Sequence, residues 1–522
     1  MLSNLIRESF LGTLYRCWEE SCTLALLRRL WRLLCRLAAG SLLLQLAFGP
    51  SPGDRLWAES LIGRILHSLP AGVSRLLRPI RRAFAESAVG GSSLLRGSAV
   101  LHFDVLFGLF CCIMFAVPHK DWNNLYALIG AAVFFAVYLL LAAGDRRSLL
   151  PPDSLGLGPA LFMLACVLSL LFSPDRADSF RVLLYYVTGF LLCWVVAASC
   201  RDLAGLRRLL GFLYLSLLLV SAEAIVQRLM GLVAVNASFT DTAINVGVPG
   251  RVYGSLDNPN NLSGFLQTIL PLGAAFAGGT KREGKRFLLT LGLVLPVVAL
   301  VMTYSRSGWL AMLLAALVYL FYCDKKLVPA LVVLALLALP ILPRSVLVRL
   351  STIFNSHDSS RNHRLAIWQG VLALLGDKGY WLTGIGLGPN AFKEIYPEYA
   401  VAQGKMGAYH SQMLYLELDL ELGLLGALSF LWMMLKLAGR IGRAIYRGGD
   451  RQLLKILIAA AASFAALAFS AAVEYVWFYP RCIFAFFLML GVTLSALRLA
   501  ERGPDPDTGD GAAPEGGAAS ER

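Results

Sequence analysis

Long apolar runs separated by short polar connections make up the chain from residue 98 onward. The hydrocarbon core of a bilayer requires about 20 consecutive apolar residues in helical form. Twelve runs approach that length: 99–117, 124–143, 156–173, 180–199, 208–230, 260–279, 286–304, 308–323, 327–343, 410–437, 453–473 and 481–498. This pattern predicts an all-α polytopic membrane protein with about twelve transmembrane helices.

The basic residues between these runs predict the orientation of the chain. Cytoplasmic loops of membrane proteins are enriched in Lys and Arg. Alternate connections collect such residues, whereas the others carry single charges such as Lys120 and Arg176. The basic connections hold Arg146, Arg147, Arg201, Arg207, Arg208, Lys281, Arg282, Lys285, Arg286, Lys325, Lys326, Arg440, Arg443, Arg447, Arg451 and Lys455. Both termini are therefore predicted to be cytoplasmic, with residues 344–409 forming a large extracytoplasmic loop between the ninth and tenth spans.

The segments outside the predicted spans differ in composition. Loop 344–409 contains several Trp and Tyr residues, which argue against disorder. Residues 1–97 mix Leu and Trp with regularly spaced Arg, which suits amphipathic helices on an anionic membrane surface, and a solvated cytoplasmic arm is the alternative. We therefore expect an interfacial arm (1–97), a transmembrane domain (98–500) and a disordered cytoplasmic tail (501–522) rich in Gly, Pro, Ala and acidic residues.

The composition agrees with lipid as the solvent. Of the 522 residues, 57% are hydrophobic and 15% are charged, and the mean hydropathy is +0.65. The formal net charge of +14 does not indicate a nucleic-acid partner, because the basic residues lie between apolar runs rather than on one basic helix. The 10 cysteines include no Cys-x-x-Cys pair and none in the large loop, so neither a disulfide framework nor a zinc site is indicated.

Polar residues gather just before the predicted span at 260–279. The segment Arg251-Val-Tyr-Gly-Ser-Leu-Asp-Asn258-Pro-Asn260-Asn places a guanidinium, a carboxylate and three amides on the predicted outer side. The planar fork of Arg suits a phosphate, to which it can donate two hydrogen bonds. An anionic lipid headgroup is one candidate ligand. A plain turn with a helix cap is the alternative, because Asn-Pro-Asn-Asn also has the chemistry of both.

Two further arginines lie on the predicted outer side. Arg306 sits in a connection so short that it stays near the membrane surface, where it either snorkels to lipid phosphate or points into a protein cavity. Arg364 precedes Trp368 in the large loop, and a run of alternating glycines, Gly384 to Gly388, follows. That run does not fit a dinucleotide-binding fingerprint. The loop histidines lack a metal-ligand pattern, so we predict no metal site.

His410, Glu417 and Glu421 form a third group of candidates. We expect His410 to begin the tenth span, where steps of seven and four residues would put all three side chains on one face of the helix. Ionisable groups at membrane depth are costly and usually mark a functional site. If the span instead begins near Leu420, His410 and Glu417 lie on an extramembrane extension, and a structural role becomes the alternative.

Taken in order, these segments resemble the O-antigen ligase family, which also includes O-antigen polymerases. The family pattern comprises Arg-x-x-Gly…Asn-Pro-Asn, a Tyr-Ser-Arg turn, Arg-x-x-x-Trp followed by Gly-x-Gly, and a His-containing segment that leads to Glu-x-Gly-x-x-Gly. Here these elements are Arg251 to Asn260, Ser305-Arg306, Arg364 to Trp368 with Gly384 to Gly388, and His410 to Gly426. No single motif is specific, whereas the ordered set is.

The resemblance implies an enzyme of the bacterial cytoplasmic (inner) membrane that works as a glycan ligase or polymerase. Such enzymes transfer a glycan from a polyprenyl-diphosphate carrier to an acceptor hydroxyl at the outer face. The implied partners are a lipid-linked glycan donor, a glycan or lipid acceptor and membrane lipids, and no cofactor is implied. The implied catalytic residues are Arg251, Arg306 and His410, with Arg364, Asn258, Asn260, Glu417 and Glu421 binding the substrate.

The resemblance gives the arginines and the histidine different tasks. The arginines bind the diphosphate and neutralise the leaving group, and the ligase histidine acts as a base on the acceptor hydroxyl. In the ligases that histidine precedes the glycine of Glu-x-Gly by eleven residues, and counting back from Gly423 reaches Gln412, two residues after His410. Glutamine cannot serve as a general base.

Two other functions remain open from the sequence. A transporter or flippase of lipid-linked or small anionic solutes would favour charged groups along a midplane pathway and internal repeats. The chain shows no convincing repeat, and its polar groups cluster on the outer side. An inactive membrane scaffold is the second alternative, and Gln412 at the position of the ligase histidine keeps it open.

Overall fold

The computed structural model describes residues 29, 48, 59–86, 102–142, 156–235, 247–325, 327–338, 340, 342–352, 359–401 and 408–502. Every regular element in these residues is an α-helix or a 3-10 helix. A helix satisfies its backbone hydrogen bonds within one segment, which the interior of a bilayer demands. The all-α class predicted from the apolar runs is therefore confirmed for the described residues.

A helix covers each of the twelve segments predicted to span the membrane. Within the described ranges, eight helices are long and apolar enough to cross a bilayer: α10 (Asn124–Ala142), α12 (Arg176–Ser199), α13 (Leu203–Leu229), α15 (Glu283–Gly292) continued by α16 (Val294–Met302), α17 (Arg306–Asp324), α23 (Leu414–Arg447), α24 (Arg451–Ala471) and α25 (Pro480–Arg502). Three apolar helices are shorter: α9 (Phe103–Ala116), α11 (Gly158–Phe172) and α18 (Leu327–Ala338). The remaining helix, α14 (Pro259–Gly278), lies inside the bundle with most of its side chains buried. A count of twelve spans thus stays a prediction.

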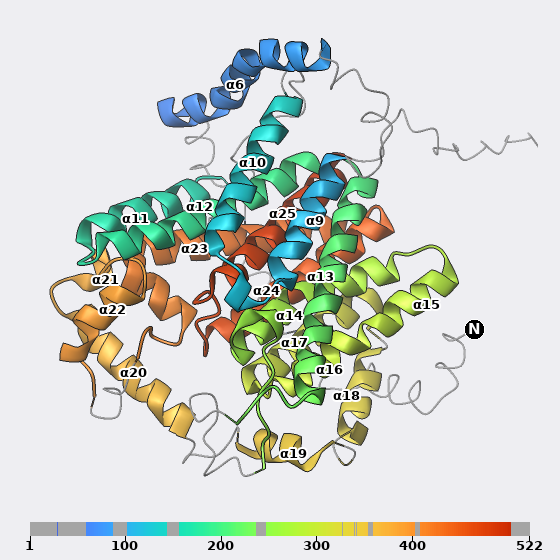
Figure 1. Ribbon diagram of the computed structural model, residues 1–522, viewed down its shortest axis with the longest axis vertical. Helices are drawn as coiled ribbons and strands as arrows, with labels where there is room; N and C mark the ends of the chain where they lie inside the picture. Colours follow the sequence, from blue (N-terminus) through green and yellow to red (C-terminus); the bar gives the residue numbers. More distant parts are fainter. Residues whose placement is uncertain are drawn as a thin grey trace, which may run out of the picture.

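The core of the bundle forms around α25, which packs against α12, α13, α14, α23 and α24 (Figure 1). Nearly all its side chains as far as Leu497 are buried. Small residues allow close approach between helices. On α12, for example, Gly189 faces the ring of Phe487, and a Cβ at Gly189 would lie 2.3 Å from Phe487 Cδ2. Helix α25 is therefore enclosed by the other helices.

Residues 344–409 contain α19 (Arg344–Ser351), α20 (Ser359–Gly376), α21 (Tyr380–Thr383), α22 (Pro389–Ile395) and the 3-10 helix η6 (Tyr396–Glu398). Helices α20, α21 and α22 lie together at one side of the bundle, and α19 follows along its lower edge in Figure 1. A separate hydrophobic core that includes Ile367 joins α20 to α22 and η6. Within it, the rings of Phe392 and Tyr396 stack with centroids 4.5 Å apart. We call residues 344–401 the outer cap, after its predicted side of the membrane.

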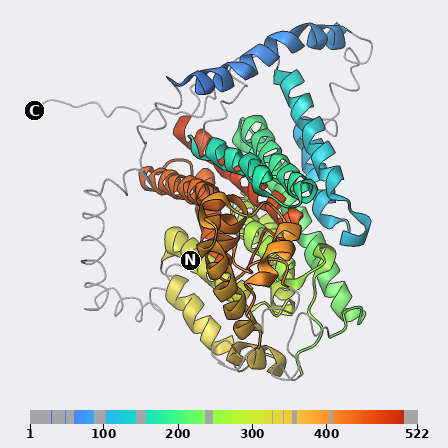
Figure 2. The same cartoon turned by 90° about the vertical axis from the view of Figure 1, so that its left-hand side faces the viewer.

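One helix of the N-terminal arm is described, α6 (Leu61–Glu86), which packs against α10 at the end of the molecule away from the outer cap (Figures 1 and 2). Its exposed side chains include both Arg75 and Leu76, and its position on a membrane surface stays a prediction. Glu501 and Arg502, assigned to the tail from the sequence, form the last turn of α25, where Glu501 accepts a hydrogen bond from Arg440 at 3.0 Å. Residues 503–522 lie outside the described ranges.

Candidate functional site

Four arginines from four separate segments lie where the outer cap meets the helix bundle. Arg251 lies between α13 and α14, Arg306 is the first residue of α17, Arg349 belongs to α19 and Arg364 belongs to α20. The charges of the other three all act on Arg251. The structure thus brings together the three arginines predicted from the sequence and adds Arg349. No motif had marked Arg349, because it lies in a short basic segment without aromatic or glycine neighbours.

Arg251 is held firmly by the protein and is only 6% exposed. Its Nε donates to the carbonyl oxygen of Thr303 at 2.6 Å, and its Nη2 donates to Asn260 Oδ1 at 2.7 Å. Asn258 caps α14 by accepting from the backbone N–H of Asn260 at 2.8 Å. The Asn-Pro-Asn element is therefore a helix cap, as the alternative interpretation expected, and it also positions a buried arginine.

The electrostatics of this cluster are strongly positive. Burial, followed by repulsion from Arg349, lowers the pKa of the Arg251 guanidinium to about 9, while Glu474 opposes that shift. Arg251 remains a cation at neutral pH, because that value is still well above 7. A partly buried group of guanidinium cations suits an anion that carries several charges and several acceptor oxygens, and a diphosphate meets both conditions.

The Tyr-Ser-Arg turn is bound to α19. Arg306 Nη1 donates to the carbonyl oxygen of Thr352 at 3.0 Å and to its hydroxyl at 3.1 Å. Arg349, which is buried, donates from Nε to the carbonyl oxygen of Tyr304 at 3.2 Å. Ser305 caps α17 by accepting from the backbone N–H of Gly308. Arg306 therefore contacts the outer cap, and its place in a substrate site stays a prediction.

Arg364 forms an ion pair with Glu474, a residue between α24 and α25, and their side chains are 19% and 15% exposed. The same Glu474 oxygen, Oε1, accepts from Asn260 Nδ2 at 3.2 Å. Arg364 Nε is buried and has no hydrogen-bond partner among the described residues. Hydrogen bonds therefore run from Arg251 through Asn260 and Glu474 to Arg364. The sequence interpretation missed Glu474, although an isolated acidic residue between two predicted spans on the outer side was a usable signal.

His410 lies next to this network, with its ring centroid 5.3 Å from that of Tyr475 and 4.6 Å from that of Phe478. Burial, followed by the positive charge of Arg364, lowers the pKa of His410 to about 3, so the ring is neutral at physiological pH. Its Nδ1 accepts a hydrogen bond from the backbone N–H of Gln412 at 3.0 Å. Because Nδ1 accepts this bond, the hydrogen of the neutral ring is assigned to Nε2.

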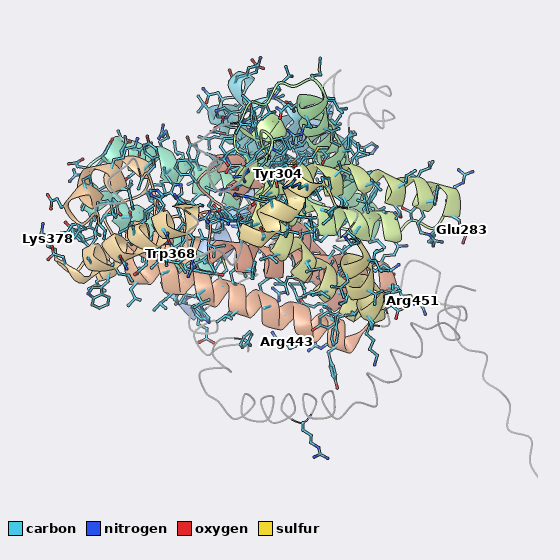
Figure 3. The ribbon with its side chains drawn as sticks, turned by 90° about the horizontal axis from the view of Figure 1, so that it is seen from below. Glu283, Tyr304, Trp368, Lys378, Arg443 and Arg451 are labelled. Atoms are coloured by element: carbon cyan, nitrogen blue, oxygen red, sulfur yellow. The ribbon has the colours of Figure 1, made fainter. Side chains whose placement is uncertain are left out.

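The segment that carries His410 does not belong to the helix that follows. Helix α23 begins at Leu414, and Gln412 has a positive φ of 57°, so the expectation that His410 begins this helix is wrong. The segment is held instead by tertiary contacts. Trp368 Nε1 donates to the carbonyl oxygen of Ser411 at 3.0 Å, and the backbone N–H of Ser411 donates to the Glu417 carboxylate. Trp368, labelled in Figure 3, thus connects α20 to the histidine segment.

Glu421 connects α23 to the outer cap. Its Oε1 accepts from the backbone N–H of Gly388 at 2.9 Å, and its Oε2 accepts from the Tyr475 hydroxyl at 3.3 Å. Glu417 and Glu421 are both buried. The Glu417 carboxylate accepts from Ser411, and the Glu421 carboxylate accepts from Gly388 and Tyr475. Their assignment to substrate binding stays a prediction.

Within the described ranges, no group of three or more His, Cys, Asp or Glu side chains could hold a metal ion. The described cysteines are all free, and each except Cys323 is buried. The chemistry available at the site is therefore that of guanidinium cations, amides, one neutral imidazole and carboxylates.

Comparison with known families agrees with this arrangement. Residues 291–431 match a family model described as O-antigen ligase. The matched segment includes Arg306, Arg349, Arg364 and His410, whereas Arg251 and Glu474 lie outside it. No curated protein matches the chain. The match supports membrane glycan transfer of the ligase or polymerase type.

Proposed function

We propose that this chain transfers a glycan from a polyprenyl-diphosphate carrier to an acceptor hydroxyl, a function supported by the match of residues 291–431 to a family model described as O-antigen ligase. The reaction takes place at the outer face of the cytoplasmic membrane. The observation that carries the proposal is the convergence of Arg251, Arg306, Arg349 and Arg364 where the outer cap meets the bundle, with each arginine held by a hydrogen bond to a distant segment or to the network of Asn260 and Glu474.

The arginine cluster provides fixed positive charge, which would stabilise the diphosphate leaving group of such a reaction. When the bond between the anomeric carbon and the diphosphate oxygen breaks, the electron pair stays on the diphosphate, and its negative charge grows. Fixed hydrogen-bond donors stabilise developing charge at little cost in reorganisation. Arg251 is already fixed by Thr303 and Asn260, and Arg364 keeps an unused donor at Nε. Both arginines are suited to a diphosphate oxygen.

The test is transfer by the purified protein in lipid, supplied with a polyprenyl-diphosphate oligosaccharide and candidate acceptors. Arg251→Ala and Arg306→Ala are each expected to lower the transfer rate by about 100-fold or more, as is typical when a donor that stabilises developing charge is removed. Arg251→Lys keeps the positive charge but loses the planar guanidinium that can donate two parallel hydrogen bonds, so a smaller loss of transfer rate is expected than for Arg251→Ala. Arg286→Ala is the control, because Arg286 is an exposed cation on α15, remote from the outer cap.

The products of the same assay distinguish a polymerase from a ligase. Longer carrier-linked chains identify a polymerase, and glycan on a different acceptor identifies a ligase. Full transfer by folded Arg251→Ala and Arg306→Ala variants would contradict the diphosphate role. Movement of the lipid-linked glycan across a vesicle membrane without any transfer would support the transporter alternative instead.

A further inference from the structure

Glu474 contacts Arg364 of the arginine cluster directly and is linked to Arg251 through Asn260. Its Oε1 accepts from Asn260 and from Arg364. Its Oε2 has no hydrogen-bond partner among the residues that the structure describes, and the side chain keeps 15% of its surface exposed. The carboxylate is therefore oriented by two partners at one oxygen while the second remains free to accept a proton.

The groups next to Glu474 are less suited to accept a proton. His410 Nδ1 already accepts the N–H of Gln412, and its Nε2 carries the hydrogen of the neutral ring. Gln412 has no basic atom. The Glu421 oxygens each accept a hydrogen bond from the protein, one from Gly388 and one from Tyr475. Glu474 alone in this set combines a contact to the arginine cluster with an unoccupied acceptor oxygen.

We propose that Glu474 accepts the proton of the acceptor hydroxyl during glycan transfer, a role that rests on the function proposed above. The hydroxyl oxygen forms a bond to the anomeric carbon of the donor glycan. The bond from that carbon to the carrier diphosphate breaks, and its electron pair leaves with the diphosphate. The hydroxyl proton moves to Glu474 Oε2 and passes from there to water, which regenerates the carboxylate.

The two partners of Oε1 fit this role. Arg364 and Asn260 together fix the orientation of the Glu474 carboxylate, and Asn260 also accepts a hydrogen bond from Arg251. A general base acts from within hydrogen-bond reach of the proton that it takes. Because Glu474 and the arginines that would hold the diphosphate belong to one network, a bound donor and an acceptor hydroxyl at Oε2 would lie side by side.

The deciding variant is Glu474→Gln, which keeps the shape of the side chain and an oxygen that can accept from Asn260 and Arg364 but which cannot take a proton. Transfer is expected to fall by about 100-fold or more, the usual range for loss of a general base. Binding of the polyprenyl-diphosphate oligosaccharide is expected to stay within about threefold of the wild type, since that ligand is held by the arginines. The matched control is Glu394→Gln, an exposed carboxylate on α22.

A second variant distinguishes a base from a structural partner. In Glu474→Ala, added formate can occupy the space of the lost carboxylate, and partial recovery of transfer that rises with formate concentration is expected for a missing base. Wild-type transfer by Glu474→Gln would overturn the proposal, and so would an equal loss of donor binding and transfer without formate rescue. If the wild-type protein itself transfers nothing from a competent donor, the proposed function fails before Glu474 is tested.

Discussion

The neighbours of His410 decide what its ring can do. A solvated histidine exchanges its proton near neutral pH, but here the ring lies between Tyr475 and Phe478 and next to the positive charge of Arg364. The pKa of His410 falls to about 3 for these reasons. Over the physiological range it is a neutral group that donates from Nε2, which argues for a positioning or acceptor-binding role.

The lowered pKa predicts how stability depends on pH. An unfolded His410 binds a proton below about pH 6.5, whereas the folded one resists protonation down to about pH 3. Its contribution to folding is therefore complete above pH 6.5 and is lost as the pH falls toward 3. Between pH 7.5 and 5.5, the wild type is expected to lose about 1 kcal/mol more stability than His410→Gln. Thermal unfolding of both proteins in lipid nanodiscs at the two pH values measures this difference.

The control for this measurement is His102→Gln, because His102 is an exposed histidine at the start of α9. It is expected to keep the pH dependence of the wild type. An identical pH slope for His410→Gln and the wild type would show that His410 ionises as readily in the folded protein as in the unfolded one.

Glycines with positive φ join α23 to the outer cap. Gly423 interrupts α23 with a φ of 65°, and Gly384 opposite it has a φ of 70°. The backbones come so close that a Cβ at Gly423 would lie 2.2 Å from the Leu382 carbonyl oxygen. A hydrogen bond from the N–H of Ile385 to the Leu420 carbonyl oxygen, 2.7 Å long, joins the two segments. Gly384 and Gly423 are therefore explained by this contact between elements.

Gly423→Ala is expected to destabilise the protein by about 2 kcal/mol or more, because the added Cβ meets both an unfavourable φ and a carbonyl oxygen. Transfer is expected to fall as well, since the same contact region positions Glu421 against Gly388. The matched control is Gly264→Ala in α14, where a Cβ would meet no atom within 4 Å and helix propensity favours alanine. Thermal unfolding checks both variants, and equal stability of Gly423→Ala and the wild type would contradict the argument.

At the scale of the whole molecule, the site depends on segments that are far apart in the chain. Arg251, Arg306, Arg364 and Glu474 precede four different helices or belong to them, yet they meet where the outer cap contacts the bundle. Helix α15 lies far from α20 to α22 in the bundle (Figure 1), and Glu283, at its start, is far from Lys378 of the outer cap in Figure 3. This arrangement fits a membrane protein whose chemistry is confined to one face.

The predicted orientation gives a direct test. In a variant without its own cysteines, Glu394→Cys in the outer cap is expected to react with a membrane-impermeant maleimide in cells whose outer membrane alone is permeabilised. Glu283→Cys is expected to react only after the inner membrane is opened, because it lies in a basic connection. Both side chains are exposed, so the labelling depends on which side of the membrane each residue lies and not on burial in the protein. The reverse pattern would place the arginine cluster in the cytoplasm and rule out chemistry at the outer face.

The class of protein, the positions of the helices and three of the four clustered arginines could be predicted from the sequence alone. Long apolar runs and charges beside them are local properties, and each can be recognised without its tertiary neighbours. The ordered motifs likewise indicated the family, to which residues 291–431 were then matched.

The contacts that connect those residues could not be predicted without the folded structure. Arg349 and Glu474 stand in segments without a motif, and their importance lies in contacts with residues far along the chain. The start of α23 at Leu414 also depended on tertiary contacts, because Trp368 and Glu417 hold the histidine segment in a non-helical form that helical spacing had not predicted. Hydropathy fixes which segments enter a bilayer, whereas the network of buried polar groups is fixed only when those segments pack together.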